Sequence, residues 1–463
     1  MLETLFPYKM HLYILQLEGY QVGRFLKWIR LNLTKRSANS KKRLVWTFKA
    51  AFIFYSALFY VVMFNFLLVY TLKYLGLFVG VLLATQSYLF LILGLLTLKP
   101  YEILNRKRVK RETHTKTLLL KQRGLKVIGI AGSYGKTSVK EFLYQILKTK
   151  YNVLRTPESY NTVFGVWKVV DYELDNQYDF FICEMGAYKI GEIKEICEMV
   201  VPDHAILTGI NEQHMDRFKK IENTIKAKFE IVDYSNEKGI TLVNGNNEYI
   251  QKNYAKHRSS CVLYASPSSG YNIKNIKSDK AGSRFTLELG GNTFEASTKL
   301  IGNSNLENIS AAASMAYLLG LEPQLIVEAV SHLQSIPHRQ ELKTWPNGLM
   351  VIDDAYSSNV TGFKAALELL KSYSAYHKVI ATPGIVELGD KTTTIHKELG
   401  ELADSVCDKV FLIGKNERTL SFLEGVGSKN KVMFLNSLSE LPKYITDTNN
   451  TVVLIENDLP DNY

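Results

Sequence analysis

A phosphate-binding pattern lies near residue 130. In the stretch KVIGIAGSYGKTSVKEFLYQIL, the apolar residues 126–131 predict a buried strand, and a helix is expected from Lys136 onward. The glycines between them let backbone N–H groups approach an anion at a helix N-terminus. A lysine here reaches the β- and γ-phosphates of a nucleotide, and the following hydroxyl holds Mg²⁺. The alternative is a strand-to-helix turn without nucleotide. The candidate nucleotide-binding residues of this loop are Gly132, Ser133, Gly135, Lys136, Thr137 and Ser138.

Strands and helices must alternate around this loop to position it. Four apolar strand candidates (KVIGIAG, FFICEMG, HAILTGI and GITLVNG) are separated by helical stretches, which predicts an α/β domain with a mainly parallel sheet. A β-hairpin is expected to turn at Gly290 and Gly291, and an Ala-rich helix to end at Gly320. After Pro337 five more strand candidates follow (LMVIDDAY, KVIATPG, KVFLIGK, KVMFLN and TVVLIEN), which predict a second, Rossmann-like domain.

Two long apolar runs precede the phosphate loop. Residues 50–72 and 74–98 are separated only by Lys73, and each is long enough to cross ~30 Å of hydrocarbon as a helix. The alternative is a buried hairpin of a soluble protein. Lys and Arg cluster before the first run and after the second, so both ends are expected on the cytoplasmic side. Residues 1–46 predict a basic amphipathic segment, either an interfacial helix on anionic lipid or an ordinary packed helix.

The charge distribution argues against a nucleic-acid partner. The net charge is +11, but residues 21–49 contain nine Lys and Arg with no acidic residue, and residues 99–126 contain ten. From Val127 onward acidic residues outnumber basic ones. The excess of positive charge therefore belongs to the flanks of the apolar runs, and the remaining chain has no basic footprint for nucleic acid. The four cysteines form no C-x-x-C pair, which is typical of reduced thiols in a cytosolic compartment.

The sequence motif of the phosphate loop resembles that of one family in particular. In a generic P-loop the first glycine would fall at Ile130, whereas G-I-x-G-S-x-G-K-T-S is similar to the Mur ligases, ATP-dependent ligases that join amino acids or peptides to carboxylates. Further motifs of this family follow in the same order over roughly residues 126–416. The likeness is greatest to the branch of UDP-N-acetylmuramoyl-tripeptide D-alanyl-D-alanine ligases.

The resemblance implies a two-metal catalytic centre. In ICEMGAYKIGEI it makes Glu184 a Mg²⁺ ligand, and in TGINEQHMDRF it makes His214 the ligand of a second metal. In IKAKFEI it makes Lys228 the lysine that is carbamylated in this family. The alternatives are a solvated strand-end Glu, a structural His and an exposed helical Lys, with Lys226 as the neighbouring choice. The implied catalytic residues are Lys136, Glu184, His214 and Lys228, and the implied metal ligands are Thr137, Glu184 and His214.

The resemblance also assigns nucleotide and substrate contacts. IGNSNLENISAAAS is similar to the family motif whose two asparagines contact the nucleotide, here Asn305 and Asn308, although Ser304 replaces the usual His. Helix capping by Asn305 is the alternative. Arg339 and Asp354 would reach ATP from the last domain. The implied substrate contacts, from ESYNTVFGV, VIDDAYSSN and TPGIVELGDKTTTIH, are Asn161, Gly165, Tyr356, Asn359, Glu387 and His396.

The predicted fold class is α/β: a membrane helical hairpin, then a P-loop Mur ligase central domain and a Rossmann-like C-terminal domain. The expected boundaries are a basic segment at 1–46, two transmembrane helices at 47–98, a basic linker at 99–124, the central domain at 125–336 and the C-terminal domain at 337–463. The family's separate UDP-binding domain is not recognised, and the chain stops at VVLIENDLPDNY without the branch's K-G-S-R-like strand end.

The predicted function is a membrane-anchored, ATP-dependent amide ligase that acts through an acyl phosphate. It would use two Mg²⁺ ions and add an amino acid or a dipeptide such as D-Ala-D-Ala to a peptidoglycan precursor. Its expected location is a bacterial cell membrane, with the catalytic domains on the cytoplasmic side. The alternatives are a ligase acting on a lipid-linked or poly-γ-glutamate-type substrate, and a nucleotide-binding membrane scaffold without catalysis. A transport ATPase is disfavoured because two spans form no pore without oligomerisation.

Overall fold

The computed structural model describes residues 6–32, 44–213, 215–279, 281–345, 347–356 and 358–457. These residues form two compact units that divide between Arg108 and Val109.

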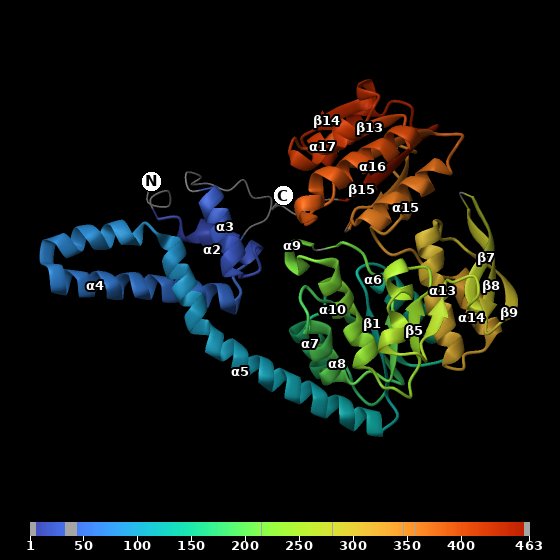
Figure 1. Ribbon diagram of the computed structural model, residues 1–463, viewed down its shortest axis with the longest axis horizontal. Helices are drawn as coiled ribbons and strands as arrows, with labels where there is room; N and C mark the ends of the chain where they lie inside the picture. Colours follow the sequence, from blue (N-terminus) through green and yellow to red (C-terminus); the bar gives the residue numbers. More distant parts are fainter. Residues whose placement is uncertain are drawn as a thin grey trace. The chain divides into compact units, whose positions relative to one another are not determined.

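The N-terminal unit is built on a helical hairpin. It contains α2 (Tyr8–Leu17), α3 (Val22–Leu31), α4 (Phe48–Ala84) and the beginning of α5 (Ser87–Gln122). Figure 1 shows α4 turned back on itself, and the reversal occurs at Lys73, whose φ of 51° and ψ of −126° are not helical. The two legs touch, because a Cβ on Gly76 would lie 1.9 Å from the Leu68 carbonyl oxygen. The predicted hairpin with its turn at Lys73 is therefore present.

The second predicted run differs from the observed helices. It is divided at Thr85 and Gln86, where α4 ends and α5 begins, and α5 then continues through Pro100 to Gln122. The segment expected to be a basic linker is thus mostly the second half of a helix. Likewise, the single amphipathic segment expected at the N-terminus contains the two helices α2 and α3.

The hairpin exposes apolar side chains along its length. At its base, Leu12 and Phe25 from α2 and α3 pack with Ile53 and Leu91 in a small core. Beyond the base, large apolar residues face outward, among them Tyr55, Phe59, Phe66, Tyr70, Leu75 and Phe78. Within the described residues α4 and α5 are both long and apolar enough to cross a membrane.

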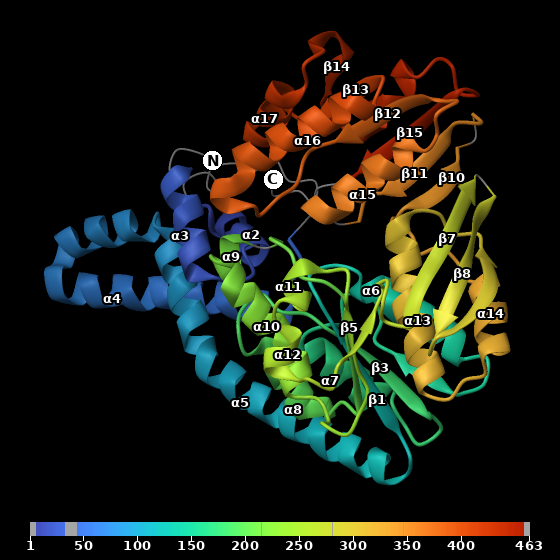
Figure 2. The ribbon, with the colours of Figure 1, turned by 45° about the vertical axis from the view of Figure 1, so that its right-hand side comes forward.

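The central domain contains a parallel six-stranded sheet in the order β2-β3-β1-β4-β5-β6. α6 and α13 pack on one face, and α7, α8 and α10 pack on the other (Figure 2). All four strands expected from the sequence are observed as β1, β3, β4 and β5, and the three-residue strands β2 and β6 extend the edges. The strands are β1 (Lys126–Ala131), β2 (Val153–Arg155), β3 (Phe180–Met185), β4 (His204–Leu207), β5 (Thr241–Asn244) and β6 (Val262–Tyr264). The helices are α6 (Lys136–Leu147), α7 (Val163–Tyr172), α8 (Glu192–Val200), α9 (Met215–Phe218), α10 (Ile221–Asp233), α11 (Glu248–Gln251), α12 (Tyr254–His257), α13 (Asn303–Leu318) and α14 (Pro323–Ser331).

A separate three-stranded antiparallel sheet packs beside α13. It consists of β7 (Tyr271–Asp279), β8 (Gly282–Leu289) and β9 (Asn292–Thr298). The hairpin between β8 and β9 turns at Gly290 and Gly291, as predicted, and both glycines have positive φ (60° and 84°). The Ala-rich helix is α13, which ends at Leu318 just before Gly320.

The C-terminal domain contains a mixed sheet in the order β10-β11-β15-β12-β13-β14. Its five parallel strands are those expected from the sequence, and β10 adds an antiparallel strand at the edge that was not predicted. The strands are β10 (Glu341–Thr344), β11 (Met350–Asp354), β12 (His377–Thr382), β13 (Lys409–Ile413), β14 (Val432–Leu435) and β15 (Thr451–Glu456). The helices are α15 (Val360–Lys371), α16 (Thr392–Val406), α17 (Glu417–Gly425) and the short 3₁₀ turns η1 (Gly389–Lys391), η2 (Lys429–Lys431) and η3 (Leu438–Tyr444).

Candidate active site

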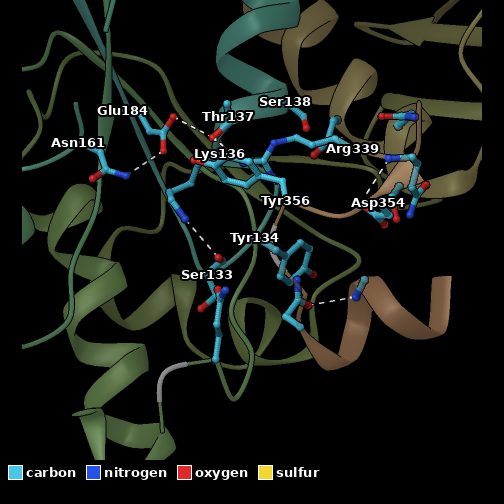
Figure 3. A pocket seen from close by; sticks show the side chains of 18 of the residues that line it. Ser133, Tyr134, Lys136, Thr137, Ser138, Asn161, Glu184, Arg339, Asp354 and Tyr356 are labelled. Carbon is cyan, nitrogen blue, oxygen red and sulfur yellow. Dashed lines mark hydrogen bonds between the residues drawn. The ribbon is translucent and has the colours of Figure 1, made fainter. Parts of the chain in front are cut away.

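A cavity of about 400 Å³ lies where the central and C-terminal domains meet. Its walls come from the loop after β1, the end of β3, the start of α13 and the strand ends of the C-terminal sheet. Polar and charged side chains predominate in this lining (Figure 3). The residues predicted for the site that line it are Ser133, Gly135, Lys136, Thr137, Ser138, Asn161, Glu184, Asn305, Asn308, Arg339, Asp354, Tyr356 and Asn359.

The glycines of the phosphate loop are required by close contacts. Gly132 has a φ of +154°, and a Cβ there would lie 2.1 Å from the Thr208 Oγ1. Gly135 has a φ of +78°, and its Cβ would lie 2.7 Å from the Asn308 Oδ1. The bare backbone at these positions leaves N–H groups accessible at the N-terminus of α6, which is the cradle that a nucleotide phosphate needs.

Lys136 is folded over this loop. Its Nζ donates to the carbonyl oxygens of Gly132 at 2.8 Å and Ser133 at 3.2 Å. Burial lowers the pKa of Lys136, the negative charge of Glu184 opposes that effect, and the positive charge of Arg339 adds to it. The ammonium therefore sits at the point where phosphate charge would be neutralised.

Glu184 is the centre of a buried polar network at the end of β3. Its Oε2 accepts from the Thr137 hydroxyl at 3.0 Å, and its Oε1 accepts from the Asn161 side-chain amide at 3.1 Å. The Lys140 Nζ lies 3.2 Å from Oε2. Burial by itself raises the pKa of Glu184, but the charges of Lys140 and Lys136 and the two hydrogen bonds more than compensate and lower it. Glu184 is therefore held in its ionised form.

Thr137 and Glu184 suit one Mg²⁺ ion. Mg²⁺ is usually held by one or two carboxylates together with substrate phosphates and water, so a hydroxyl and a carboxylate beside a phosphate cradle fit that chemistry. Within the described ranges no group of three or more His, Cys, Asp or Glu side chains comes together. His214, the predicted ligand of a second metal, lies outside the described residues, so its role stays a prediction.

Lys228 is buried behind the cavity rather than lining it. Its Nζ donates to the Ala187 carbonyl oxygen at 3.1 Å and lies 5.6 Å from the centre of the Phe218 ring. Burial, reinforced by the charge of Lys136, lowers the pKa of Lys228 to about 7. A substantial fraction of this amine is therefore neutral at pH 7, and only the neutral form can react with carbon dioxide to give a carbamate. Carbamylation of Lys228 stays a prediction.

The C-terminal domain contributes directly to the cavity. The Arg339 Nη2 donates to the Thr137 hydroxyl at 3.3 Å, and its guanidinium stacks 4.4 Å from the centre of the Tyr356 ring. The Tyr356 hydroxyl lies 3.3 Å from the Ser159 hydroxyl of the central domain. Burial raises the pKa of Asp354 to about 7, against hydrogen bonds from Gln340 and the charge of Arg339.

Four asparagines lie at or near the cavity, as two pairs with different structural roles. Asn359 caps α15 by accepting from the Gly362 N–H at 3.0 Å, and the same oxygen accepts from the Asn211 amide of the central domain at 2.7 Å. Asn305 and Asn308 lie within α13, which begins at Asn303. Asn305 donates to the Ile301 carbonyl oxygen at 2.9 Å, so it does not cap the helix N-terminus.

Three predicted substrate residues lie away from the described cavity lining. His396 is fully buried: its Nε2 accepts from the Ile385 N–H at 2.9 Å, and its Nδ1 donates to the Thr392 carbonyl oxygen at 2.6 Å. Glu387 is 3.4 Å from the Arg217 guanidinium, which is a contact between the two domains. Gly165 packs against the backbone of Tyr160 and thereby shapes the loop that carries Asn161. Their predicted contact with substrate stays a prediction.

Several lining residues were not predicted. Glu456 is the last residue of the apolar strand β15, at the carboxyl end of the strand. A carboxylate in that position is the same sequence signal that identified Glu184 at the end of β3. Gln340 follows Arg339 directly, and Tyr134 lies inside the phosphate loop. Lys140 is not part of the lining but is buried against Glu184, and nothing in its sequence context distinguishes it from an exposed helical lysine.

Comparison with known families decides the classification. The Mur ligase middle domain matches residues 130–316, and the Mur ligase, glutamate ligase domain matches residues 338–455. This part of the chain belongs to the Mur ligase family. The prediction of a Mur-type ligase is confirmed at that level, and so is the prediction of an α/β fold with two domains of this kind.

Individual relatives of the Mur ligase family agree with this. The chain is 31% identical over 298 residues to UDP-N-acetylmuramoyl-tripeptide D-alanyl-D-alanine ligase of Bacillus subtilis, covering 64% of this chain and 64% of that protein. The Escherichia coli ligase of the same name is 29% identical over 306 residues, covering 65% of this chain and 67% of that protein. The chain therefore spans about two thirds of the length of these curated relatives.

Solved structures share the fold. MurF from Acinetobacter baumannii superimposes with a TM-score of 0.68 at 24% identity, covering 76% of this chain and 77% of that one. MurF ligase from Thermotoga maritima in complex with ADP also gives a TM-score of 0.68, at 23% identity, covering 76% of this chain and 80% of that one.

Proposed function

We propose that this protein is an ATP-dependent ligase that joins a carboxylate to an amine through an acyl phosphate. The observation that carries the proposal is the convergence of Lys136, Glu184 and Arg339, from two domains, on one cavity at a phosphate cradle. Phosphate binding alone does not require a buried carboxylate at Mg²⁺ distance from the cradle or an arginine delivered by a second domain. Both groups serve phosphoryl transfer, because they neutralise, directly or through bound Mg²⁺, the charge of the transferring γ-phosphoryl group.

Each residue has a defined part in that reaction. The loop at Gly132 and Gly135 binds the phosphates, and Lys136 and Arg339 neutralise charge where the γ-phosphoryl group meets a carboxylate anion. Thr137 and Glu184 would hold Mg²⁺, which when bound supplies further charge neutralisation. Contacts between the domains, such as Asn211 with Asn359, exclude water from an acyl phosphate that would otherwise hydrolyse.

The substrate proposal follows the names of the relatives. We propose a peptidoglycan precursor as the acid and an amino acid or a dipeptide such as D-Ala-D-Ala as the amine, because relatives named as D-alanyl-D-alanine ligases align over 298 and 306 residues, which are 64% and 65% of this chain. A lipid-linked precursor or a poly-γ-glutamate-type acid is the second candidate, supported by the apolar hairpin that precedes the catalytic unit.

We propose that the hairpin of α4 anchors the protein in a bacterial membrane, with the catalytic unit in the cytoplasm. Its outward-facing apolar side chains are the supporting observation, and the basic residues on both flanks favour the cytoplasmic side. In a cysteine-free variant, a single cysteine at Lys73 should react with an impermeant maleimide added outside spheroplasts, whereas a cysteine at Lys126 should not. Labelling of both from one side would contradict this topology.

The activity is tested on the full chain in detergent. Phosphate release should require ATP, an acid and an amine together, and mass spectrometry should detect a new amide. UDP-linked and polyprenyl-linked muramoyl peptides are compared as acids, with D-Ala-D-Ala and single amino acids as amines. Lys136→Ala should abolish the product, while Lys148→Ala, an exposed lysine at the end of the same helix, should not. ATP consumption without any amide across this panel would overturn the proposal.

A further inference from the structure

A second cavity, of about 250 Å³, lies where the three-stranded sheet meets α15. Its central-domain wall contains Ser278 and Asp279, at the end of β7, and Ile301. Its C-terminal-domain wall contains the end of α15 and the residues after it: Leu369, Ser372, Tyr373, Ser374, Ala375 and Tyr376. Among the described residues, this lining shares no member with that of the candidate active site. The cavity is therefore a separate site with a wall from each domain.

The floor of this cavity is apolar and belongs to the contact between the domains. Ile301 is part of the central domain, yet it packs in the core of the C-terminal domain with Leu369 and Tyr373. These three side chains are only 3%, 8% and 9% exposed. A Cβ on Gly302 would lie 3.3 Å from the Leu369 Cδ2, so the two domains are closely packed beside the cavity. A molecule on this floor would touch both domains and would need an apolar part.

The rim of the cavity is negatively charged. Asp279 is the one charged residue in the described part of the lining, and no ion pair within the described residues includes it. Its Oδ1 accepts from the Ala281 N–H at 2.7 Å. The C-terminal end of α15 adds partial negative charge, because the last carbonyl groups of a helix point out of its end. Burial raises the pKa of Tyr373, and Tyr376 and the charge of Asp279 add to the rise, so the negative potential extends into the cavity.

Two tyrosine rings complete the wall. The ring centres of Tyr373 and Tyr376 are 5.9 Å apart, and the rings meet edge to face at 71°. The face of an aromatic ring attracts cations, as a carboxylate does, and both repel anions. A cation with an apolar body therefore matches the floor, the rim and the rings together. The volume is below the ~300–1,000 Å³ that is usual for drug-sized ligands, which favours a small molecule.

We propose that this cavity binds a small organic cation, with its apolar body on Ile301 and Leu369 and its charged group between Asp279 and the tyrosine rings. Alkylammonium, arylammonium and guanidinium compounds belong to this class. The inference goes beyond the proposed function and does not depend on it. Because such a ligand touches both domains, it would hold them together, and it would thereby regulate any reaction that requires their contact.

The test uses 4-fluorobenzylammonium as the probe and measures its affinity for the full chain in detergent by ¹⁹F NMR. 4-Fluorobenzyl alcohol has nearly the same shape without the charge, so it separates charge from apolar contact and from uptake by the detergent. The wild type should bind the ammonium compound about threefold or more tightly than the alcohol. A non-hydrolysable ATP analogue should not displace the probe, because the linings of the two cavities share no described residue.

Variants on both walls test the contact with both domains. Asp279→Asn alters an exposed side chain and should weaken binding of the ammonium compound about threefold to fivefold, with little effect on the alcohol. Tyr376→Leu should weaken it about threefold or more. Two matched controls should leave the affinity unchanged. Glu295→Gln alters an exposed carboxylate of the same small sheet, and Tyr444→Leu alters an exposed tyrosine of the C-terminal domain.

Limited proteolysis tests whether the ligand holds the domains together. At a probe concentration well above its Kd, cleavage between the domains should slow about threefold or more in the wild type, because only the joined arrangement offers the complete cavity. Asp279→Asn at the same probe concentration should show a smaller effect.

Each contrary outcome overturns the inference. Absence of binding, equal binding of the ammonium compound and the alcohol, or displacement by the ATP analogue would show that the cavity is not a cation site. Unchanged affinity in Asp279→Asn or in Tyr376→Leu would place the probe elsewhere. Binding with an unchanged rate of cleavage would refute the bridging of the domains. None of these measurements requires amide formation, so their failure is distinct from a failure of the ligase proposal.

Discussion

Replacement of Lys140 by Met tests the charge balance around Glu184. The Lys140 side chain is fully buried, and its Nζ lies 3.2 Å from the Glu184 Oε2 and 3.5 Å from the Glu141 Oε1. Met has a similar length and keeps the apolar stem, so the change removes a charge with little change in volume. Glu184 would keep Thr137, Asn161 and the more distant charge of Lys136 as partners.

The expected loss follows from the geometry. At 3.2 Å and an effective dielectric constant of about 20, the attraction between the two charges is ~5 kcal/mol. Desolvation of the lysine offsets part of this, and removal of one partner from a buried pair typically destabilises by about 3–5 kcal/mol. Although the distance is that of an ion pair, the Lys140 Nζ has no well-aligned hydrogen bond. The low end, about 3 kcal/mol, is therefore expected.

Thermal unfolding with and without ligand measures this effect. For a domain of this size, 3 kcal/mol corresponds to a fall of roughly 6–12 °C in Tm. With Mg²⁺ and a non-hydrolysable ATP analogue, the fall should be smaller, because the metal would replace the missing positive charge beside Glu184. As a control, Lys148→Met alters an exposed lysine at the C-terminal end of α6, the helix that contains Lys140, and should shift Tm by less than about 1 °C. A Lys140→Met variant with equal losses in both conditions, or with less than about 1 kcal/mol in either, would refute this account of the pair.

Three further predictions concern the same unit. Burial lowers the pKa of Lys228 to about 7 from an ordinary value of 10.5, so between these pH values the unfolded chain binds a proton that the folded chain does not, and stability should rise with pH by up to ~5 kcal/mol. Urea unfolding at pH 7 and pH 9.5 should show about 3 kcal/mol of this rise in the wild type and not in Lys228→Met. An equal change in unfolding free energy between these pH values in the two proteins would contradict it. In Gly132→Ala the new Cβ would lie 2.1 Å from the Thr208 hydroxyl, so calorimetry should show ATP affinity reduced about tenfold or more, and an unchanged Kd would count against the cradle. Asn211→Ala removes the 2.7 Å bond to Asn359, about 1 kcal/mol, and should make limited proteolysis between the domains about fivefold faster, whereas an unchanged rate would show that other contacts hold them.

Local pattern was sufficient for most of the fold. The apolar strands of both domains and the loop at Lys136 were predicted because buried parallel strands and glycine turns have strong sequence signals. β2 and β6 have only three residues each, and β10 pairs antiparallel at an edge, so none has enough periodicity to be recognised. The turn at Lys73 was predicted from a single charge, but the break at Thr85 and Gln86 interrupts no apolar pattern strongly enough to show.

Site residues were predicted where they belong to a sequence motif. They were missed where only the fold brings them near the site. Asp354 was identified from its motif, whereas Glu456 became significant only when the register placed it beside Asp354. Lys140 reads as an ordinary helical lysine until the fold buries it against Glu184. His396 shows the reverse: its motif suggested ligand binding, but backbone groups occupy both of its ring nitrogens.

Asn359 combines two structural roles at the contact between the central and C-terminal domains. Its side-chain oxygen accepts hydrogen bonds both from the Gly362 N–H in the first turn of α15 and from the Asn211 amide of the central domain. If the two domains separated to admit or release reactants, the bond to Gly362 would remain, so the first turn of α15 would stay capped. Separation at this point would then lose only the neutral bonds of the Asn211 amide, to Asn359 at 2.7 Å and to Thr361 at 3.4 Å, and a neutral hydrogen bond contributes on the order of 1 kcal/mol.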